Sequence, residues 1–320
     1  MPLSYDTEFS QAAAGILALK ASSPPWAVHD IEVRRVGITA SYAAMFAKLP
    51  DAPHVEQTIH QIRSYDGETI CVYQFSPKNS TSTAPGPAVV HFHGGGMIQG
   101  NVELFRRMLS LQVQQTGVQV FSVDYRLAPE KPHPTPVEDC YAGLTWVHQH
   151  AEELAVDRSR MATMGESAGG GLAAGVALMA RDRGLSPPLA KQILIYPMLD
   201  DRNTVPIPSL EPLALWRNDD NITGWTALLG KDIGTDNASP YAAPARATSV
   251  DGLPPTYLDV GELDIFRDED IAYVGRIAAA NISVELHVYP SLPHAFEVYA
   301  PNTKATQRAV ADRHRAISTL

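Results

Sequence analysis

The chain reads Arg160-Met161-Ala162-Thr163-Met164-Gly165-Glu166-Ser167-Ala168-Gly169-Gly170-Gly171 at its middle, and this stretch decides the expected fold. A short apolar run enters it, and a run of small residues from Leu172 to Ala180 leaves it with helical character. Between them stands Gly-x-Ser-x-Gly, the pattern of a sharp strand-to-helix turn with a serine at its apex. Side chains at positions 165 and 169 would collide with neighbouring backbone, so we expect Ser167 in a strained conformation.

The same turn would direct a helix N-terminus at the serine hydroxyl. Unpaired N–H groups and the helix dipole there favour negative charge. A Gly/Ala-rich helix start with an incidental serine is the alternative interpretation of this stretch. The rest of the chain has to decide between the two.

Composition limits the classes of function. The 320 residues are 45% apolar and 19% charged, which is typical of a soluble globular protein with a large core. A net charge of −10 argues against nucleic acids and anionic membranes as partners. Cys71 and Cys140 cannot form a disulfide framework, which favours a reducing compartment. We find no signal peptide and no apolar run long enough to span a membrane, so we expect a cytoplasmic protein.

Residues 1–50 form a segment of their own in the pattern. Apolar residues repeat at helical spacing from Phe9 to Leu19 and again from Tyr42 to Leu49, with Ser22-Ser23-Pro24-Pro25 between the two stretches. Two interpretations remain open: a helical pair packed on the core, or a cap over a pocket.

Strand-like and helix-like segments alternate from residue 51 to the C-terminus. This alternation predicts an α/β fold with a mostly parallel central sheet flanked by helices. The Pro-rich interval at about 200–245 interrupts it and is interpreted as an insertion over the carboxyl ends of the strands, where such sheets bind ligands. The expected strands are 55–63, 69–75, 88–92, 118–123, 160–164, 191–196, 256–260 and 284–289, and the expected helices are 102–116, 137–150, 168–183, 268–280 and one from about 303.

A serine nucleophile needs a base, and the base needs an orienting acid. The strand at 256–260 leads to Asp264, and the strand at 284–289 leads to His294, in the order serine, acid, histidine. Asp259, Glu262 and Asp268 compete with Asp264 for the role of acid. Among the other histidines, we expect a structural role for His287 and a solvated position for His314.

His93-Gly94-Gly95-Gly96 follows the buried strand at 88–92. Consecutive glycines let backbone amides approach a developing oxyanion, so Gly94 and Gly95 are predicted donors together with Ala168. A His91/His93 metal pair lacks further ligands in the sequence. A phosphate loop would need a following Lys-Ser/Thr.

With these motifs the chain resembles the hormone-sensitive-lipase-like branch of the α/β-hydrolases. The matching residues are His93–Gly96 with Gly100, Asp124–Glu130, Gly165–Gly170, Tyr196-Pro197, Ser239-Pro240, Asp264–Asp268 and His294. The resemblance implies the α/β-hydrolase fold with a helical cap, Asp264 as the acid, and Arg126 fixing loops through carboxylates such as Glu130. The sequence departs from many relatives at Glu166, Met97 and Ala295.

The sequence therefore predicts a serine carboxylesterase that hydrolyses small, short-acyl esters through Ser167, His294 and Asp264. Candidate pocket residues are Phe46, Met97, Trp216 and Trp225. We expect no metal or organic cofactor, a small-molecule ester as the partner, and no nucleic acid; a homodimer is left open. An amidase, formamidase or lactonase on the same triad and a non-catalytic small-molecule receptor remain alternatives.

Overall fold

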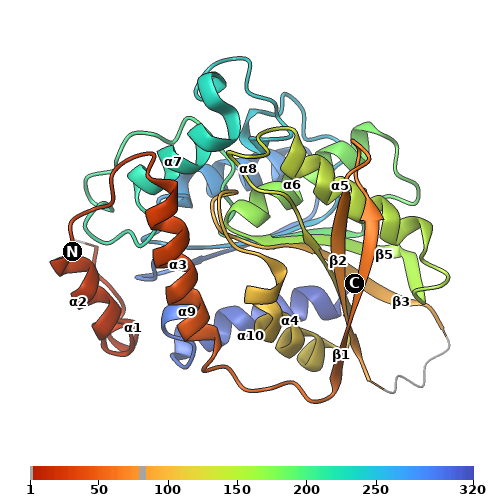
Figure 1. The fold of residues 1–320 in the computed structure, drawn as a ribbon, viewed down its shortest axis with the longest axis horizontal. Helices are drawn as coiled ribbons and strands as arrows, with labels where there is room; N and C mark the ends of the chain where they lie inside the picture. Colours follow the sequence, from red (N-terminus) through yellow and green to blue (C-terminus); the bar gives the residue numbers. More distant parts are fainter. Residues whose placement is uncertain (1–2, 79–83) are drawn as a thin grey trace.

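An eight-stranded sheet runs through the middle of the molecule (Figure 1). The computed structural model describes residues 3–78 and 84–320. The strands lie in the order β1-β2-β4-β3-β5-β6-β7-β8. β1 pairs antiparallel with β2 and β2 antiparallel with β4, whereas every other neighbouring pair is parallel. The predicted α/β class with a mostly parallel sheet is confirmed.

The strands match the predicted ones closely. They are β1 Val55–Arg63, β2 Thr69–Pro77, β3 Gly86–Phe92, β4 Gln119–Asp124, β5 Val156–Glu166, β6 Lys191–Ile195, β7 Thr256–Gly261 and β8 Val284–Tyr289. All six residues of β7 are buried, because helices cover both of its faces. β5 begins earlier than predicted, at the buried Val156, and continues through the polar residues 157–160, which are partly or fully exposed.

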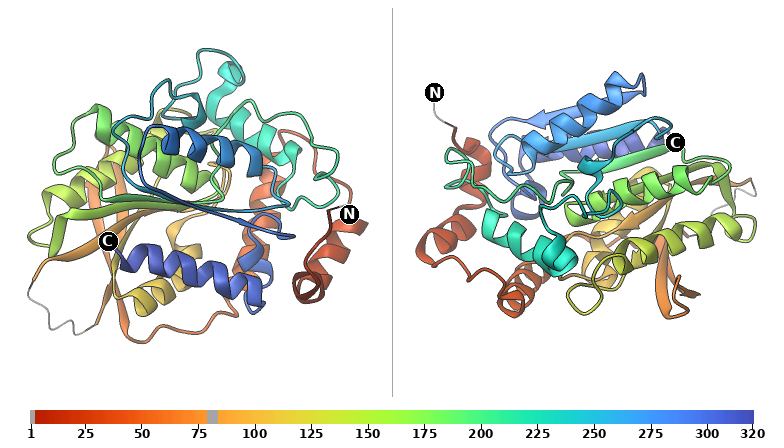
Figure 2. Two further views of the ribbon diagram at one scale, coloured as in Figure 1. Left: turned by 180° about the vertical axis from the view of Figure 1, so that it is seen from behind. Right: turned by 90° about the horizontal axis from the view of Figure 1, so that it is seen from above.

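Two layers of helices cover the sheet. α4 (Val102–Thr116) and α10 (Lys304–Ser318) lie on one face, and α5 (Thr135–Gln149), α6 (Ala168–Asp182) and α8 (Arg267–Ala279) lie on the other (Figures 1 and 2). Thirteen consecutive residues of α6, from Ala168 to Ala180, are buried, since this helix packs on β3, β5 and β6 and against the neighbouring α5. Among the described helices none is long and apolar enough to cross a bilayer.

The N-terminal segment is helical, with one difference from the prediction. The first stripe is broken at Ala13 into α1 (Thr7–Ala12) and α2 (Ala14–Ser22), and α3 (Ile31–Phe46) follows. Phe9 packs with Tyr289 and Phe296 beside the end of β8. Much of the apolar surface of α1 is therefore buried against the sheet edge.

The interval at 200–245 contains α7 (Asn218–Leu229) and the 3₁₀ turn Gly230–Asp232, and a second 3₁₀ turn, Pro244–Arg246, follows. α3 lies beside α7 (Figures 1 and 2) and is joined to it by an Arg34 Nε–Asp220 Oδ1 ion pair of 2.9 Å. The short helix α9 (Phe296–Tyr299) was not predicted, because a single turn carries no periodic signal. α3 of the N-terminal segment and α7 of the 200–245 interval thus form a continuous layer.

Candidate active site

The turn between β5 and α6 places Ser167 at the carboxyl end of the sheet. Its backbone has φ 56° and ψ −120°, a conformation that an L-residue rarely adopts, so the predicted strain is confirmed. A Cβ at Gly165 would overlap the carbonyl of Gly169, and a Cβ at Gly169 would overlap the carbonyl of Phe92. Glycine at both positions is therefore what lets β3, β5 and α6 approach closely enough to form the turn.

Ser167, His294 and Asp264 are brought together from three loops. His294 Nε2 lies 3.0 Å from Ser167 Oγ, and His294 Nδ1 lies 2.6 Å from Asp264 Oδ2. The residues are 7%, 5% and 0% exposed, respectively. Asp264 follows β7 and His294 follows β8, so the parallel strands bring their carboxyl ends to one edge. The amide of Phe266 donates to Asp264 Oδ1 at 3.0 Å and fixes the carboxylate.

The competing carboxylates have other partners. Asp259 accepts two hydrogen bonds from Arg313, at 2.7 and 2.8 Å, deep in the sheet. Glu262 accepts from the amide of Ser291 at 2.8 Å. Asp268 pairs with Arg267 at an exposed position. Of the four candidates, only Asp264 bonds to His294 among the contacts of the described residues.

The glycine loop that follows β3 lies next to Ser167. Gly95 has φ +129°, and a Cβ there would overlap the carbonyl of Gln99, so only glycine fits. A Cβ at Gly94 would lie 3.0 Å from the carbonyl of Glu166. Gly94, Gly95 and Ser167 line one cavity at this end of the sheet, and Ala168, the residue after the serine, is the first residue of α6. The three predicted amide donors are therefore adjacent to Ser167.

The side chain of His93 contacts this glycine loop and the neighbouring Tyr125. Its ring stacks on Tyr125 at 4.3 Å between centroids, and its Nδ1 lies 2.8 Å from the Gly94 carbonyl. Burial lowers the pKa of His93 to about 4, so the neutral ring donates from Nδ1 to that carbonyl. The first histidine of the motif thus holds the glycine loop in place.

Glu166, which departs from the pattern of many relatives, is buried under the serine. Its Oε2 lies 2.9 Å from His91 Nε2, while His91 Nδ1 lies 2.8 Å from Ser122 Oγ. The side chains of His91 and His93 therefore bond to protein groups. The sequence motif did not reveal this link, because it joins three neighbouring strands.

Aromatic rings surround the imidazole of His294. The rings of Tyr196, Phe266 and Trp216 have centroids 4.6, 5.3 and 6.4 Å from it. The Tyr196 hydroxyl donates to Glu297, which also pairs with Arg313 at 2.9 Å. Burial raises the pKa of Tyr196 well above its usual value, so this hydroxyl keeps its proton. These rings exclude water from the imidazole and fix its plane.

A cavity of about 350 Å³ opens onto Ser167 and His294. Its lining is mostly apolar and includes Ile16, Ile38, Tyr42, Trp216 and Val298. The side chains come from α2, α3, the 200–245 interval and α9.

Only one of the four predicted pocket residues lines this cavity, namely Trp216. Phe46, Met97 and Trp225 are buried in the main hydrophobic core instead. Trp225 lies on α7 and is completely buried, and Met97 is held at φ 58° in the glycine loop. The predicted pocket is corrected accordingly, and α2 supplies lining residues that were not among the four candidates.

Two further expectations are corrected. Arg126 forms ion pairs with Asp66 and Asp139, at 2.8 and 2.7 Å, rather than with Glu130. Glu130 pairs with Arg35 of α3 at 2.7 Å. His314 was expected in solvent, but it is only partly exposed, and burial lowers its pKa.

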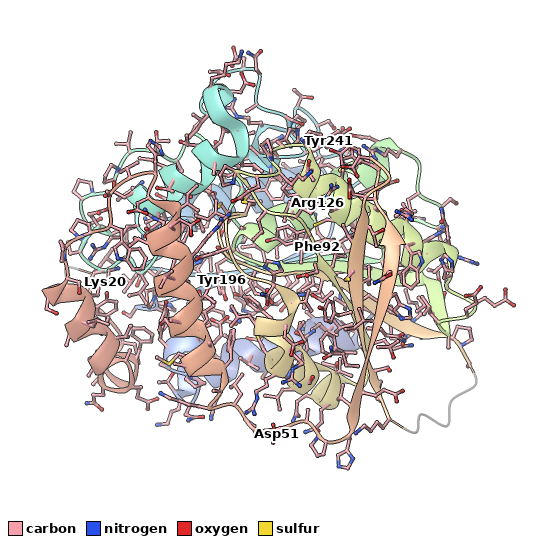
Figure 3. All side chains as sticks on the ribbon, viewed as in Figure 1. Lys20, Asp51, Phe92, Arg126, Tyr196 and Tyr241 are labelled. Atoms are coloured by element: carbon pink, nitrogen blue, oxygen red, sulfur yellow. The ribbon has the colours of Figure 1, made fainter. Side chains whose placement is uncertain are left out.

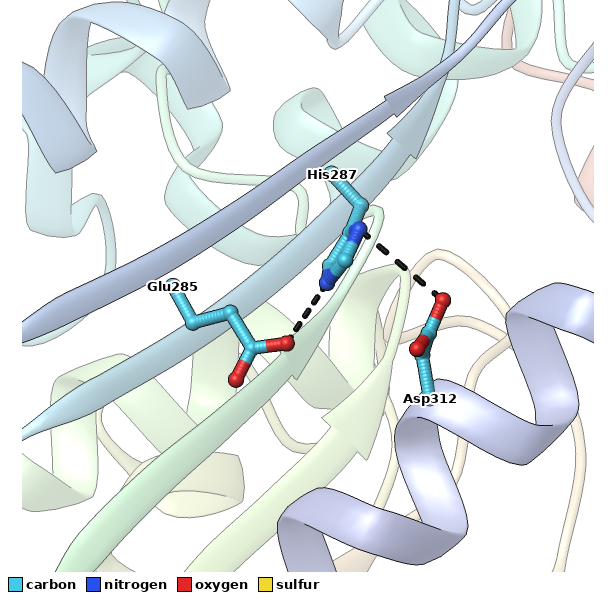
Figure 4. A group of neighbouring side chains, drawn as sticks. All are labelled: Glu285, His287 and Asp312. Atoms are coloured by element: carbon cyan, nitrogen blue, oxygen red, sulfur yellow. Dashed lines mark hydrogen bonds and ion pairs between the residues drawn. The ribbon is translucent and has the colours of Figure 1, made fainter.

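Glu285, His287 and Asp312 form a cluster on β8 and α10 (Figure 4). His287 Nε2 lies 2.6 Å from Glu285 Oε1, and Arg315 pairs with Glu285 and, at 3.4 Å, with Asp312. Because a guanidinium already neutralises these carboxylates, the cluster is explained as an ion-pair network. The structural role predicted for His287 fits these contacts.

Known proteins resemble this chain along most of its length. A family model described as the α/β-hydrolase fold matches residues 89–298. Esterase LipI of Mycobacterium tuberculosis is 34% identical over 247 residues, covering 73% of this chain and 74% of its own. Carboxylesterase NlhH of the same species is 34% identical over 276 residues, 84% of each chain. The solved structure of a bacterial heroin esterase is 37% identical, with a TM-score of 0.87 over 97% of this chain and 96% of its own.

Proposed function

Since this chain belongs to the hormone-sensitive-lipase-like branch of the α/β-hydrolase family, we propose that it hydrolyses carboxylic esters through Ser167, His294 and Asp264. The observation that carries the proposal is the continuous chain of hydrogen-bond distances from Ser167 Oγ through the imidazole to Asp264. A serine hydroxyl, a neutral imidazole and a carboxylate in this order are the groups that nucleophilic acyl transfer requires.

In the acylation step His294 Nε2 removes the proton from Ser167 Oγ, and the oxygen attacks the ester carbonyl. Asp264 holds the imidazole in the tautomer with hydrogen on Nδ1 and stabilises the imidazolium. The amides of Gly94, Gly95 and Ala168 donate to the tetrahedral oxyanion. His294 then protonates the leaving alcohol as the carbon–oxygen bond breaks. Water, deprotonated by the same imidazole, then attacks the acyl carbonyl, and the imidazolium returns the proton to Ser167 Oγ as the carboxylic acid is released.

The cavity supports esters of modest size. A volume of about 350 Å³ is at the lower end of the range for small-ligand pockets. Residues 1–50 and the 200–245 interval supply many of its walls, and we assign them the role of a cap over the catalytic domain at 51–320. Short acyl chains fit this volume with the least displacement of cap side chains.

Two measurements test the proposal. A fluorophosphonate probe followed by intact-protein mass spectrometry should label the wild type at Ser167, and Ser167→Ala and His294→Ala should remain unlabelled. A panel of p-nitrophenyl esters of increasing acyl length, with the matching anilides, should give the highest kcat/KM for short esters. Equal labelling of Ser167→Ala would refute the nucleophile, and faster hydrolysis of anilides would make the enzyme an amidase.

A further inference from the structure

The cavity has a charged end that ester hydrolysis does not use. Lys20 of α2 and Arg217, which immediately precedes α7, both line it. Lys20 and Tyr196, labelled in Figure 3, are lining residues of the same cavity. The cap therefore brings two cations into the space that also contains Ser167.

Neither cation has an ionic partner within the part of the chain that the structure describes. Lys20 Nζ and Arg217 Nε are buried without a hydrogen bond, although other atoms of Arg217 are partly exposed. A buried unpaired amine loses its hydration without compensation. Burial, with Arg217 next in effect, lowers the pKa of Lys20 to about 7, while Asp220 and Glu211 act to raise it.

Three of the four acids that line the cavity among the described residues already have partners. Glu166 bonds to His91, Asp220 pairs with Arg34, and Glu297 pairs with Arg313. Asp219 is the remaining acid that lines the cavity. Glu211 also lies near Lys20, and its Oε2 is buried without a hydrogen bond among the described residues. With Asp219 and Glu211 facing Lys20 and Arg217, this end of the cavity has room for at most one further negative charge, which matches a carboxylate better than a doubly charged phosphate.

We propose that Lys20 and Arg217 form a carboxylate-binding subsite, so that the preferred substrates are esters carrying a free carboxylate away from the scissile bond. This inference rests on the proposed esterase function and adds the substrate class. A carboxylate there would accept charge-assisted hydrogen bonds from both cations. It would also relieve the repulsion between Lys20 and Arg217 and keep the amine protonated.

The test is a preference ratio. Monoethyl esters of linear dicarboxylic acids, from adipate to sebacate, and ω-acetoxyalkanoates of the same lengths place the carboxylate on the acyl or the alcohol side. Each is compared with its analogue in which a primary amide replaces the carboxylate, and the ratio of the two kcat/KM values is recorded. We expect a ratio above one at an optimal length in one of the series.

Lys20→Met keeps the aliphatic stem and should lower the ratio by at least about tenfold, the effect expected of a charge-assisted hydrogen bond. Lys20→Arg should restore most of it, and the matched control Lys48→Met, at an exposed lysine beyond α3, should leave the ratio unchanged. Two outcomes would overturn the subsite, provided that Ser167 of the wild type is still labelled by fluorophosphonate. The first is a ratio below 1 at every length, and the second is a ratio that neither Lys20→Met nor Arg217→Met changes. Loss of that labelling would instead refute the proposed function.

Discussion

Asp270 in the first turn of α8 is a buried carboxyl group that weakens the fold at neutral pH. Asp270 is 0% exposed, and neither of its side-chain oxygens has a hydrogen-bond partner among the described residues. Burial, and then the charges of Glu269, Asp264 and Asp259, raise the pKa of Asp270 well above its usual range. The carboxyl group is therefore protonated in the folded protein at a pH where it is ionised in the unfolded chain.

This difference makes the stability depend on pH. Because the folded pKa is raised, the contribution of Asp270 to stability is greatest below its unfolded pKa of about 3.9. The contribution falls by about 1.4 kcal/mol per pH unit as the pH rises towards the folded pKa. The loss accumulates over the pH interval between the unfolded pKa and the raised folded pKa.

Asp270→Asn replaces the carboxyl with a neutral group of the same shape and removes this loss. We expect its free energy of unfolding, from urea denaturation, to exceed that of the wild type at pH 7, with the gap closing towards pH 4 at a slope of up to about 1.4 kcal/mol per pH unit. The control Asp268→Asn, at an exposed position two residues earlier in the first turn of α8, should change stability by less than about 0.5 kcal/mol. An Asp270→Asn protein that is no more stable than wild type at pH 7, or whose gap does not shrink with acid, would refute the reasoning.

Three further results are expected. Asp264→Asn should fold normally but lose about three to four orders of magnitude in kcat/KM through the wrong imidazole tautomer, and Asp268→Asn should be far milder; the reverse ranking in ester assays would move the acid to position 268. Ile38→Ala should widen the cavity and raise kcat/KM for bulky esters relative to acetate esters. Phe46→Ala, in the core, should instead cost about 3–5 kcal/mol of stability and keep the wild-type ester preference. An Ile38→Ala enzyme with the wild-type ester preference would count against the cap. Ala295→Gly should raise the free energy of unfolding by about 1 kcal/mol, because Ala295 has φ 54°, and a lower urea midpoint would contradict this.

The strands were predictable because their signal is local. β1 and β8 have the predicted bounds, since apolar and β-branched residues alternate within each and turn residues flank them. The triad was predictable for a related reason: parallel strands bring their carboxyl ends together, so a residue just after β5, β7 or β8 has to lie near the others. Chain order and strand position therefore sufficed to select Ser167, Asp264 and His294.

The pocket depends on contacts between distant segments and was predicted less well. Phe46 and Met97 are large apolar residues in the right regions, but backbone direction turns both into the core. Lys20 resembles a solvated residue on a helix face, and only the packing of the cap brings it to the cavity. Likewise, Glu130 and Arg126 are close in sequence but pair with Arg35 and with Asp66 and Asp139. The sequence pattern identifies which face of a helix or strand is apolar, whereas the ion-pair and packing partners of a residue depend on how distant elements pack.

The central claim is that Ser167 and His294 act as one catalytic unit, and a double-mutant comparison tests it most directly. Steady-state kcat on a short p-nitrophenyl ester should fall by several orders of magnitude in Ser167→Ala and in His294→Ala, and the double variant should be hardly slower than either single variant. A Ser167→Ala enzyme that keeps more than about a hundredth of the wild-type rate, or a double variant whose loss is the product of the two single losses, would contradict the account.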